Sequence, residues 1–312
     1  MSRISEHPTP EGAALHRFLV FLSAATLFLI VAGALVTSND AGLSVPDWPT
    51  SFGSFRMPPM VGGIFYEHGH RLVAGTVGLL TILLTVWVLM KEGRPWMKKL
   101  AGVALFCVVV QAVLGGITVR FFLPPPVSTF HACVAQIFFS LIVSMAVFTS
   151  RGWRSSTVHL EDPWGISLRV LSAASVGVIF LQLFLGAAFR HFWFNVIPHV
   201  ANAVVVTVMI LWTAAAVIKR FGNEPFLKRP AIAAMALLVG QLILGPGAYF
   251  LLVAATHDPQ PTQPMVSVTV AHVVVGAMTL AAMLVLMLRT FRVVAPRHRT
   301  AENMEMARSV TG

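Results

Sequence analysis

The segment "QAVLGGITVR", residues 111–120, recurs along the chain and decides how the chain is organised. Residues 182–191, "QLFLGAAFRH", and 241–250, "QLILGPGAYF", share its Gln-x-x-Leu-Gly pattern, and 29–38, "LIVAGALVTS", is a weaker copy. Each copy lies late in an apolar stretch, and a loop and a second apolar stretch follow it. Such a repeat indicates one supersecondary unit used several times. It predicts four helical hairpins, grouped as two four-helix halves.

The two halves are expected at residues 1–155 and 156–312. Because four helices separate equivalent elements, their orientation is preserved, and an approximate axis along the membrane normal should relate the halves. The repeated glycines suit close helix approach, and a glutamine in lipid needs a polar partner inside a bundle. Gln and Gly alone fit helix packing as well as they fit a ligand site.

The composition is that of a membrane protein. The 312 residues are 56% hydrophobic and 11% charged, with a mean hydropathy of +0.79, whereas about a quarter of a soluble domain is charged. A spanning helix needs about 20 apolar residues. Windows of this kind lie at roughly 17–37, 66–90, 99–119, 127–149, 166–189, 196–218, 230–253 and 266–289. The expected fold is therefore an all-α membrane protein of eight transmembrane helices, forming two pseudo-symmetric four-helix bundles.

The net charge of +10 is concentrated on one side of the expected membrane. Lys and Arg follow each even-numbered span, whereas the opposite loops hold only Arg56, Arg120 and Arg190. This asymmetry follows the positive-inside rule, puts both termini in the cytoplasm and argues against nucleic-acid binding. The first apolar run is too long for a signal-peptide core. We therefore expect a multi-pass protein of the cell inner (plasma) membrane that retains its first helix.

A histidine lies near the start of each even-numbered span: His70, His131, His199 and His272. An ionisable residue in a span is costly and is a candidate functional residue. Two neutral imidazoles that face each other across a four-helix bundle form a bis-histidine site, and haem iron is a common occupant of such sites. A structural zinc site needs four ligands. Two haems, one per half, fit the count best, although spacing alone also allows another metal or none.

The segment "EHGHR", residues 67–71, places an acid beside one of these histidines. Glu67 and His70 are three residues apart and share a helix face, whereas His68 points in nearly the opposite direction and is expected at the interface. The segment "NVIPHVANAV", residues 195–204, surrounds His199 without any acid. A carboxylate beside only one pair marks the first half as the reactive one.

Three arginines are candidate ligand-binding residues. Arg71 could pair with Glu67 or hold an anionic group, and Arg120 and Arg190 at the outer helix ends could pair with haem propionates, because Arg makes bidentate contacts with carboxylates. Snorkelling to the interface is the alternative for each of them. The long outer loop at residues 39–63 is rich in Pro, Gly and aromatic residues. We expect it to cover the outer surface of the first half as a lid.

These residues together resemble a known family. The segments "GALVTSNDAGLSVPDWP" (33–49) and "EHGHRLVAG" (67–75), followed by a histidine near the start of each later even-numbered span, are similar to haem A synthase. The resemblance runs across nearly the whole chain, and this combination of motifs is specific. It implies an oxidoreductase that acts on a methyl group: the C8 methyl of haem O is oxidised to a formyl group by two hydroxylations and loss of water, with oxygen from water.

The resemblance also implies roles for the candidate residues. His70 and His131 would flank the substrate haem O, Glu67 would be essential to catalysis, and His199 and His272 would ligate a haem B cofactor that relays electrons. The first half would then be catalytic and the second half would hold the cofactor. The implied role is cytochrome oxidase biogenesis. Haem O synthase, cytochrome oxidase assembly factors, membrane lipid and a second copy of the chain are the candidate partners.

The sequence departs from the family pattern at two places. Some members carry a cysteine pair in the first outer loop, but no cysteine lies between residues 38 and 65, which excludes thiol chemistry there. The two cysteines, Cys107 and Cys133, fall inside expected helices and should be buried without a disulfide. Val200, rather than Arg, follows His199, so propionate anchoring at that place does not carry over.

Three other functions are weighed against this one. A prenyltransferase that makes haem O would need Asp-rich magnesium sites on the cytoplasmic loops, and those loops are basic. A non-catalytic dihaem electron carrier linked to quinone would share the histidine pairs but would not need Glu67. A transporter could also use a repeat of four plus four helices. A colourless protein would favour the transporter, and a haem-binding protein that never converts haem O would favour the carrier.

Overall fold

The computed structural model describes residues 10–156, 159–255, 258 and 260–296, and these residues are largely helical. The helices are α1 (Pro10–Ser38), α2 (Gly62–Lys91), α3 (Pro95–Arg120), α4 (Pro125–Thr149), α5 (Arg151–Ser155), α6 (Leu168–Arg190), α7 (Ile197–Phe221), α8 (Pro225–Ala254) and α9 (Gln263–Val293). All except the short α5 are long and apolar enough to cross a membrane. The expected all-α fold with eight spanning helices is confirmed, and α5 is an addition that the apolar pattern does not predict.

The spanning helices follow from simple local rules. Each apolar run exceeds the length that a bilayer requires, and a helix satisfies its own backbone hydrogen bonds in lipid. Pro95, Pro125 and Pro225 begin α3, α4 and α8, at positions where a missing N–H costs little and a fixed φ favours the helix. Pro246 lies inside α8, directly after the repeat glycine Gly245.

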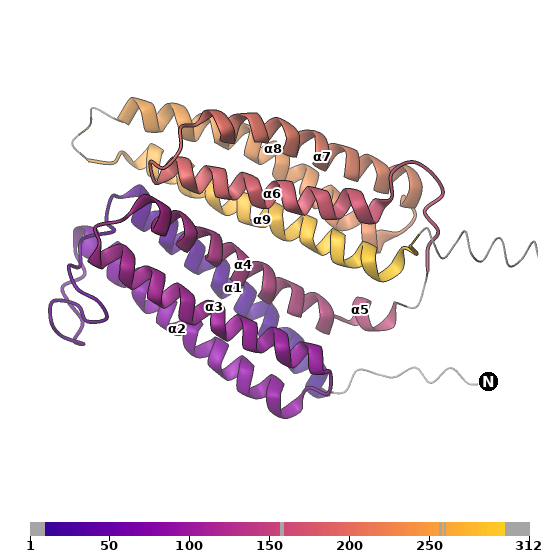
Figure 1. The fold of residues 1–312 in the computed structure, drawn as a ribbon, viewed down its shortest axis with the longest axis horizontal. Coiled ribbons are helices and arrows are strands. Elements are labelled where there is room, and N and C mark those ends of the chain that lie inside the picture. The colour runs from indigo at the N-terminus through magenta and orange to yellow at the C-terminus, as the bar shows by residue number, and fades with distance from the viewer. Residues whose placement is uncertain (1–9, 157–158, 256–257, 259, 297–312) are drawn as a thin grey trace, which may run out of the picture.

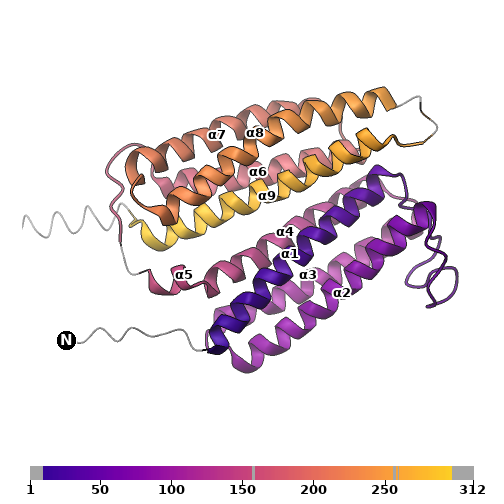
Figure 2. The ribbon, with the colours of Figure 1, turned by 180° about the vertical axis from the view of Figure 1, so that it is seen from behind.

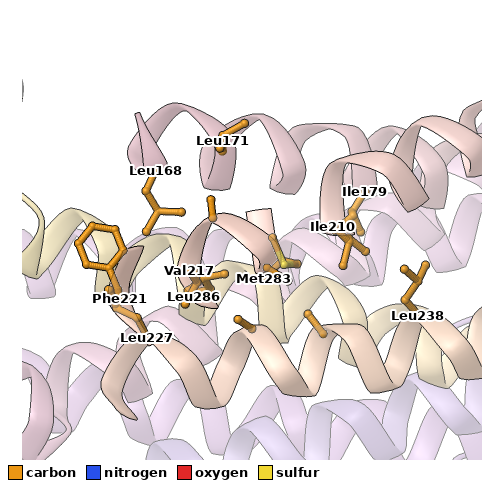
Figure 3. Packing of buried hydrophobic residues seen from close by; sticks show 14 of the residues in the cluster. Leu168, Leu171, Ile179, Ile210, Val217, Phe221, Leu227, Leu238, Met283 and Leu286 are labelled. Atoms are coloured by element: carbon orange, nitrogen blue, oxygen red, sulfur yellow. The ribbon is translucent and has the colours of Figure 1, made fainter. Parts of the chain in front are cut away.

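Figure 1 and Figure 2 show the spanning helices in two groups, α1–α4 and α6–α9. Each group has its own buried apolar core, which includes Leu84 and Ile142 in the first half and Ile210 and Met283 in the second. Figure 3 shows the second core, to which α6, α7, α8 and α9 all contribute. A smaller cluster joins the halves through Ile30 of α1, Phe139 of α4 and Ala277 of α9.

The helices α1, α3 and α6 end in the same backbone motif. In each, the residue after the cap has a positive φ: Asp40 (49°), Phe122 (58°) and Phe192 (60°). The next amide donates back to the carbonyl five residues before it, with N–O distances of 3.0 Å in α1, 2.7 Å in α3 and 2.8 Å in α6. This is the Schellman motif, which usually places glycine at the left-handed position. The sequence repeat therefore includes a shared helix ending.

The four histidines all lie toward the same end of the molecule, near the starts of α2, α4, α7 and α9. The long loop after α1 and the loop between α8 and α9 are at that end, whereas the start of α1 and the end of α9 lie at the opposite end (Figure 1). This arrangement agrees with the expected placement of both termini on one side. Which side faces the cytoplasm stays a prediction.

Candidate functional site

Each candidate histidine packs against the glycine of one repeat copy. A methyl group added at Gly33 would lie 3.4 Å from His70 Nε2, and one at Gly115 would lie 3.5 Å from His131 Cε1. In the second half, the corresponding distances are 2.8 Å from Gly186 to His199 Cε1 and 3.3 Å from Gly245 to His272 Cε1. The repeated glycines therefore leave the space that the four imidazole rings occupy.

The glutamine of the repeat fixes the histidine helix in the second half. Gln182 Nε2 donates to the His199 carbonyl at 3.0 Å, and Gln241 Nε2 donates to the His272 carbonyl at 2.8 Å. Asn202 Nδ2 in turn donates to Gln182 Oε1 at 2.8 Å. The sequence allowed the repeated Gln and Gly residues to serve either helix packing or a ligand site. In the structure they serve both, because the helix packing that they make sets the position of the histidines.

The rings of His199 and His272 lie close together in the second bundle. Their centroids are 6.2 Å apart and their planes are nearly perpendicular, at 83°. Imidazole nitrogens lie about 2 Å from a bound metal ion, so this separation leaves room for one metal ion between the two rings. To bind it, His199 would have to give up a present contact with Gln182, whose carbonyl lies 3.2 Å from His199 Nδ1 and whose Nε2 lies 3.4 Å from His199 Nε2. Nδ1 of His272, like Nδ1 of His131, is buried and has no hydrogen-bond partner among the described residues. Such an orphaned polar atom is costly unless a ligand satisfies it.

The donor set fits a bis-histidine group better than a zinc ion. Among the described residues, no three or more His, Cys, Asp or Glu side chains come together in a way that could hold a metal ion. A closed zinc site needs four such ligands. A haem iron, by contrast, takes four nitrogens from its own macrocycle and only the axial ligands from the protein. Cys107 and Cys133 are free and buried, as expected.

In the first half, the two histidines of the motif "EHGHR" point to different surroundings. His70 packs on α1 at Gly33, inside the bundle. His68 lies 2.9 Å from Ser51 Oγ through its Nδ1, so it contacts the outer loop. The expectation that only His70 faces the bundle is confirmed.

Glu67 is buried, with 4% of its surface exposed. Its Oε1 accepts a hydrogen bond from Arg71 Nη2 at 2.6 Å, and its Oε2 accepts one from the backbone N–H of Val45 at 2.7 Å. The pairing with Arg71 is one of the alternatives that the sequence allowed. A buried carboxylate is costly unless it is paired and hydrogen-bonded, and here both oxygens have partners.

The three candidate arginines all donate to the same stretch of chain, residues 37–50. Arg71 Nη1 reaches the carbonyls of Asp47 and Thr50, at 2.8 and 3.0 Å. Arg120 Nη2 donates to the Trp48 carbonyl at 3.1 Å, and Arg190 Nη2 donates to the Thr37 carbonyl at 2.7 Å. Arg190 thus reaches from the second half to the end of α1.

The loop after α1 is packed against the first half, as expected of a lid. The Trp48 ring lies against Gly116 of α3, where an added methyl group would approach it to 2.8 Å, and Ser44 lies against Gly63 of α2. The Asp47 carboxylate accepts hydrogen bonds from Thr50 Oγ1 and from the N–H groups of residues 52 and 53. These bonds lower the pKa of Asp47 from its usual value, so the turn is held by an ionised carboxylate.

Three residues at the candidate site, Trp48, Gly116 and His191, were not predicted from the sequence. Trp48 and Gly116 form the loop contact, and the adjacent glycines Gly115 and Gly116 were the signal that could have suggested it. His191 at the end of α6 lies near His131 of the first half. Its burial, together with the nearness of Arg190 and His131, lowers the pKa of His191 to about 4, so this imidazole is neutral at physiological pH.

Comparison with known proteins finds sequences that are similar to this chain. Residues 60–192 match the model of the COX15-CtaA family, described as cytochrome oxidase assembly protein. The chain is 31% identical over 179 residues to the "Heme A synthase" of Lysinibacillus sphaericus, covering 56% of this chain and 57% of that protein. The Symbiobacterium thermophilum protein of the same name is 28% identical over 254 residues, covering 72% and 81%.

The chain is similar to haem A synthases. The match to the haem A synthase of Alkalihalophilus pseudofirmus is more distant, at 23% identity, but covers 85% of this chain and 94% of the relative. The segment that matches the family model contains Glu67, His70 and His131 and ends just beyond Arg190. His199 and His272 lie outside it and stand on the geometry described above.

Proposed function

We propose that the chain acts as a haem A synthase. The substrate is haem O, and its C8 methyl group is oxidised to a formyl group. Each of two hydroxylations takes one oxygen atom from water and releases two electrons and two protons, and the resulting geminal diol loses water. The electrons pass through the second half to an external oxidant. The similarity to haem A synthases and the unequal environments of the two histidine pairs support this proposal.

The observation that carries it is the buried Glu67 one turn before His70. Residues 195–204 around His199 contain no acid, so the two halves differ at the place where oxidation would need a base. In this proposal, His70 and His131 hold the substrate. Glu67 orients a water molecule or takes its proton as the methyl carbon is oxidised, which is the usual work of a positioned carboxylate. Its two hydrogen bonds hold it in one orientation.

The second half is proposed to hold haem B between His199 and His272. When bound, that group would supply one-electron transfer at a potential set by the residues that hold it and by its surroundings. The residues of the chain hold the ligands still: Gln182 and Gln241 bind the backbone of the two histidines, and Gly186 and Gly245 leave room for the rings. Residues 1–155 would thus be the catalytic half and 156–312 the cofactor half.

The three arginines could anchor haem propionates only with hydrogen-bonding capacity that their present partners leave free or give up. Arg71, Arg120 and Arg190 already donate to backbone carbonyls, so each would bind a propionate with its remaining N–H groups or in exchange for a carbonyl. The proposed setting is the inner membrane, with both termini cytoplasmic. Haem O synthase would supply the substrate, assembly factors of cytochrome oxidase would take the product, and a homo-oligomer is compatible with this scheme.

Expression in a host that makes haem O but lacks haem A tests the proposal. Haems extracted from the membranes are identified by mass, and we expect haem A together with haem B bound to the purified protein. A protein that binds haem but leaves haem O unchanged would instead be the quinone-linked dihaem carrier. A colourless protein would contradict both histidine sites.

A further inference from the structure

Two adjacent glycines on α3 serve two different rings. Gly115 makes room for the imidazole of His131, and Gly116 makes room for the indole of Trp48, whose ring atoms would lie 2.8, 2.9 and 3.2 Å from a methyl group at Gly116. In the other three repeat copies, Ala34, Ala187 and Pro246 follow the glycine. Within the repeat, a second glycine to receive an indole therefore occurs only in the half that carries Glu67.

Trp48 is held to α3 at two points. Its ring lies on Gly116, and its carbonyl accepts a hydrogen bond from Arg120 Nη2 at 3.1 Å. Three residues earlier in the chain, the N–H of Val45 donates to Glu67 on α2. Three residues span at most about 10 Å. The position of the indole on α3 therefore restricts where the Val45 N–H can lie.

The same short stretch also sets the other partner of Glu67. Arg71 Nη2 donates both to Glu67 Oε1 and to the Val45 carbonyl, at 2.6 and 3.2 Å. Its Nη1 donates to Asp47 and Thr50, which flank Trp48 and its neighbour Pro49. If residues 45–50 moved, Oε2 of Glu67 would lose its donor and Arg71 would lose three acceptors. The carboxylate would then be free to turn about its side-chain bonds.

We propose that Trp48, seated on Gly116, is a positioning residue for Glu67. The indole fixes the position of residues 45–50 between α3 and α2. Residues 45–50 in turn orient the Glu67 carboxylate toward the site of His70. The role rests on the proposed function of the first half. It explains why an outer loop without cysteines packs against the half that carries Glu67.

The test uses the full-length protein and begins with Gly116→Ala, which places a methyl group where the indole lies. Gly102→Ala is the matched control, because it is on the same helix and a methyl group there meets nothing within 4 Å. Trypsin cleavage after the exposed Arg56 reports whether the loop is seated, independently of activity. We expect Gly116→Ala to be cut about tenfold faster than the wild type and Gly102→Ala to be cut at the wild-type rate, since exposure to proteases follows the open population.

The second readout is the product mixture in the host that makes haem O. Trp48→Ala and Gly116→Ala should each lower haem A about tenfold and raise the hydroxylated intermediate relative to haem A, while the second-half haem spectrum is unchanged. Trp48→Phe, which keeps an aromatic ring, should recover most of the output. Adding Gly116→Ala to Trp48→Ala should have no further effect, because the two act through one contact.

Each failure has a different meaning. An unchanged cleavage rate in Gly116→Ala would show that the contact between Trp48 and Gly116 does not hold the loop in place. Faster cleavage with normal haem A and no added intermediate would overturn the positioning role and leave the proposed function intact. Wild-type protein that seats its loop but makes no haem A would overturn the proposed function, and the positioning role with it.

Discussion

Glu67 and Glu92 are both paired with an arginine, but at opposite ends of α2 and in different surroundings. Glu92 and Arg94 form a 2.8 Å ion pair beyond the last turn of the helix, and Arg94 is the main cause of the lowered pKa of Glu92. Glu67 is buried, and a backbone N–H supplements its 2.6 Å pair with Arg71. One residue type therefore has two expected roles, an ion pair at the end of a helix and work at the reacting carbon.

The Glu67→Gln substitution should separate these roles. The amide keeps the size of the side chain but loses the basic oxygen, so we expect a loss of roughly 100-fold or more in haem A output, within the range for a positioned acid or base. Haem O or a hydroxylated intermediate should accumulate, and the second-half haem should remain. Mass analysis of extracted haems gives the result. Glu92→Gln is the control, and normal haem A from Glu67→Gln would reduce Glu67 to a structural residue.

A second residue-scale prediction concerns the glycine beneath His199. Gly186→Ala would put a methyl group 2.8 Å from the ring, so the imidazole must move and one of the two proposed haem ligands would be displaced. We expect the low-spin spectrum of the second-half haem to disappear, as it should in His199→Ala or His272→Ala. Gly177→Ala on the same helix meets open space and should keep the spectrum. Equal haem content in both glycine variants would remove the second pair as the cofactor site.

At the scale of elements, the ends of α3 and α6 combine strain with exposure. Phe122 and Phe192 are 80% and 85% exposed and both have a positive φ, a conformation that costs a side-chain-bearing residue about 1–2 kcal/mol. Because both side chains are exposed, burial of the phenyl rings does not offset this cost. The Schellman hydrogen bonds hold the backbone in place instead.

Replacing Phe192 with glycine should therefore stabilise the protein. Glycine adopts the left-handed region freely, and after its greater entropy in the unfolded chain is subtracted we expect a gain of about 0.5–1 kcal/mol. Thermal unfolding in detergent measures it. Phe121→Gly is the control, because Phe121 has an ordinary φ of −114° and should gain nothing. A lower melting temperature for Phe192→Gly would show that its side chain contributes a contact of its own.

At the scale of the whole molecule, the two halves are joined at the end that carries the histidines. Arg190 of α6 binds the last turn of α1, and Ser38 Oγ lies 3.0 Å from Thr269 Oγ1 of α9. Nearer the middle of the helices, Ile30, Phe139 and Ala277 pack together. Both histidine pairs are therefore held in one arrangement, which an electron path between them would require.

Topology is the prediction at this scale. The basic residues at one end of the helices predict that both termini face the cytoplasm and that all four histidines lie in the outer halves of their helices. Reporter fusions at residue 312 should be active as cytoplasmic reporters, and fusions within residues 39–61 or 254–265 as external ones. A cytoplasmic signal from either loop would reverse the orientation and move the proposed reaction to the other membrane face.

Much of this protein could be predicted from the sequence by itself. The number and approximate bounds of the spans follow from apolar length, which is a local property. The four histidines could be paired with the glycine repeat because both recur in the same register, and His70 could be preferred to His68 because helix periodicity separates their faces. The short helix α5 could not be predicted, because five residues are too few to show a helical periodicity.

Only the tertiary structure decided what the outer loop and the arginines contact. Residues 39–61 have no periodic pattern, and their position depends on Gly63 and Gly116 in two other helices. Arg71, Arg120 and Arg190 look alike in sequence, yet two hold the loop and one crosses to the other half. The burial of Glu67 has the same origin. A helix forms from its own residues, whereas a loop without regular structure takes its place only from the surfaces that packing brings beside it.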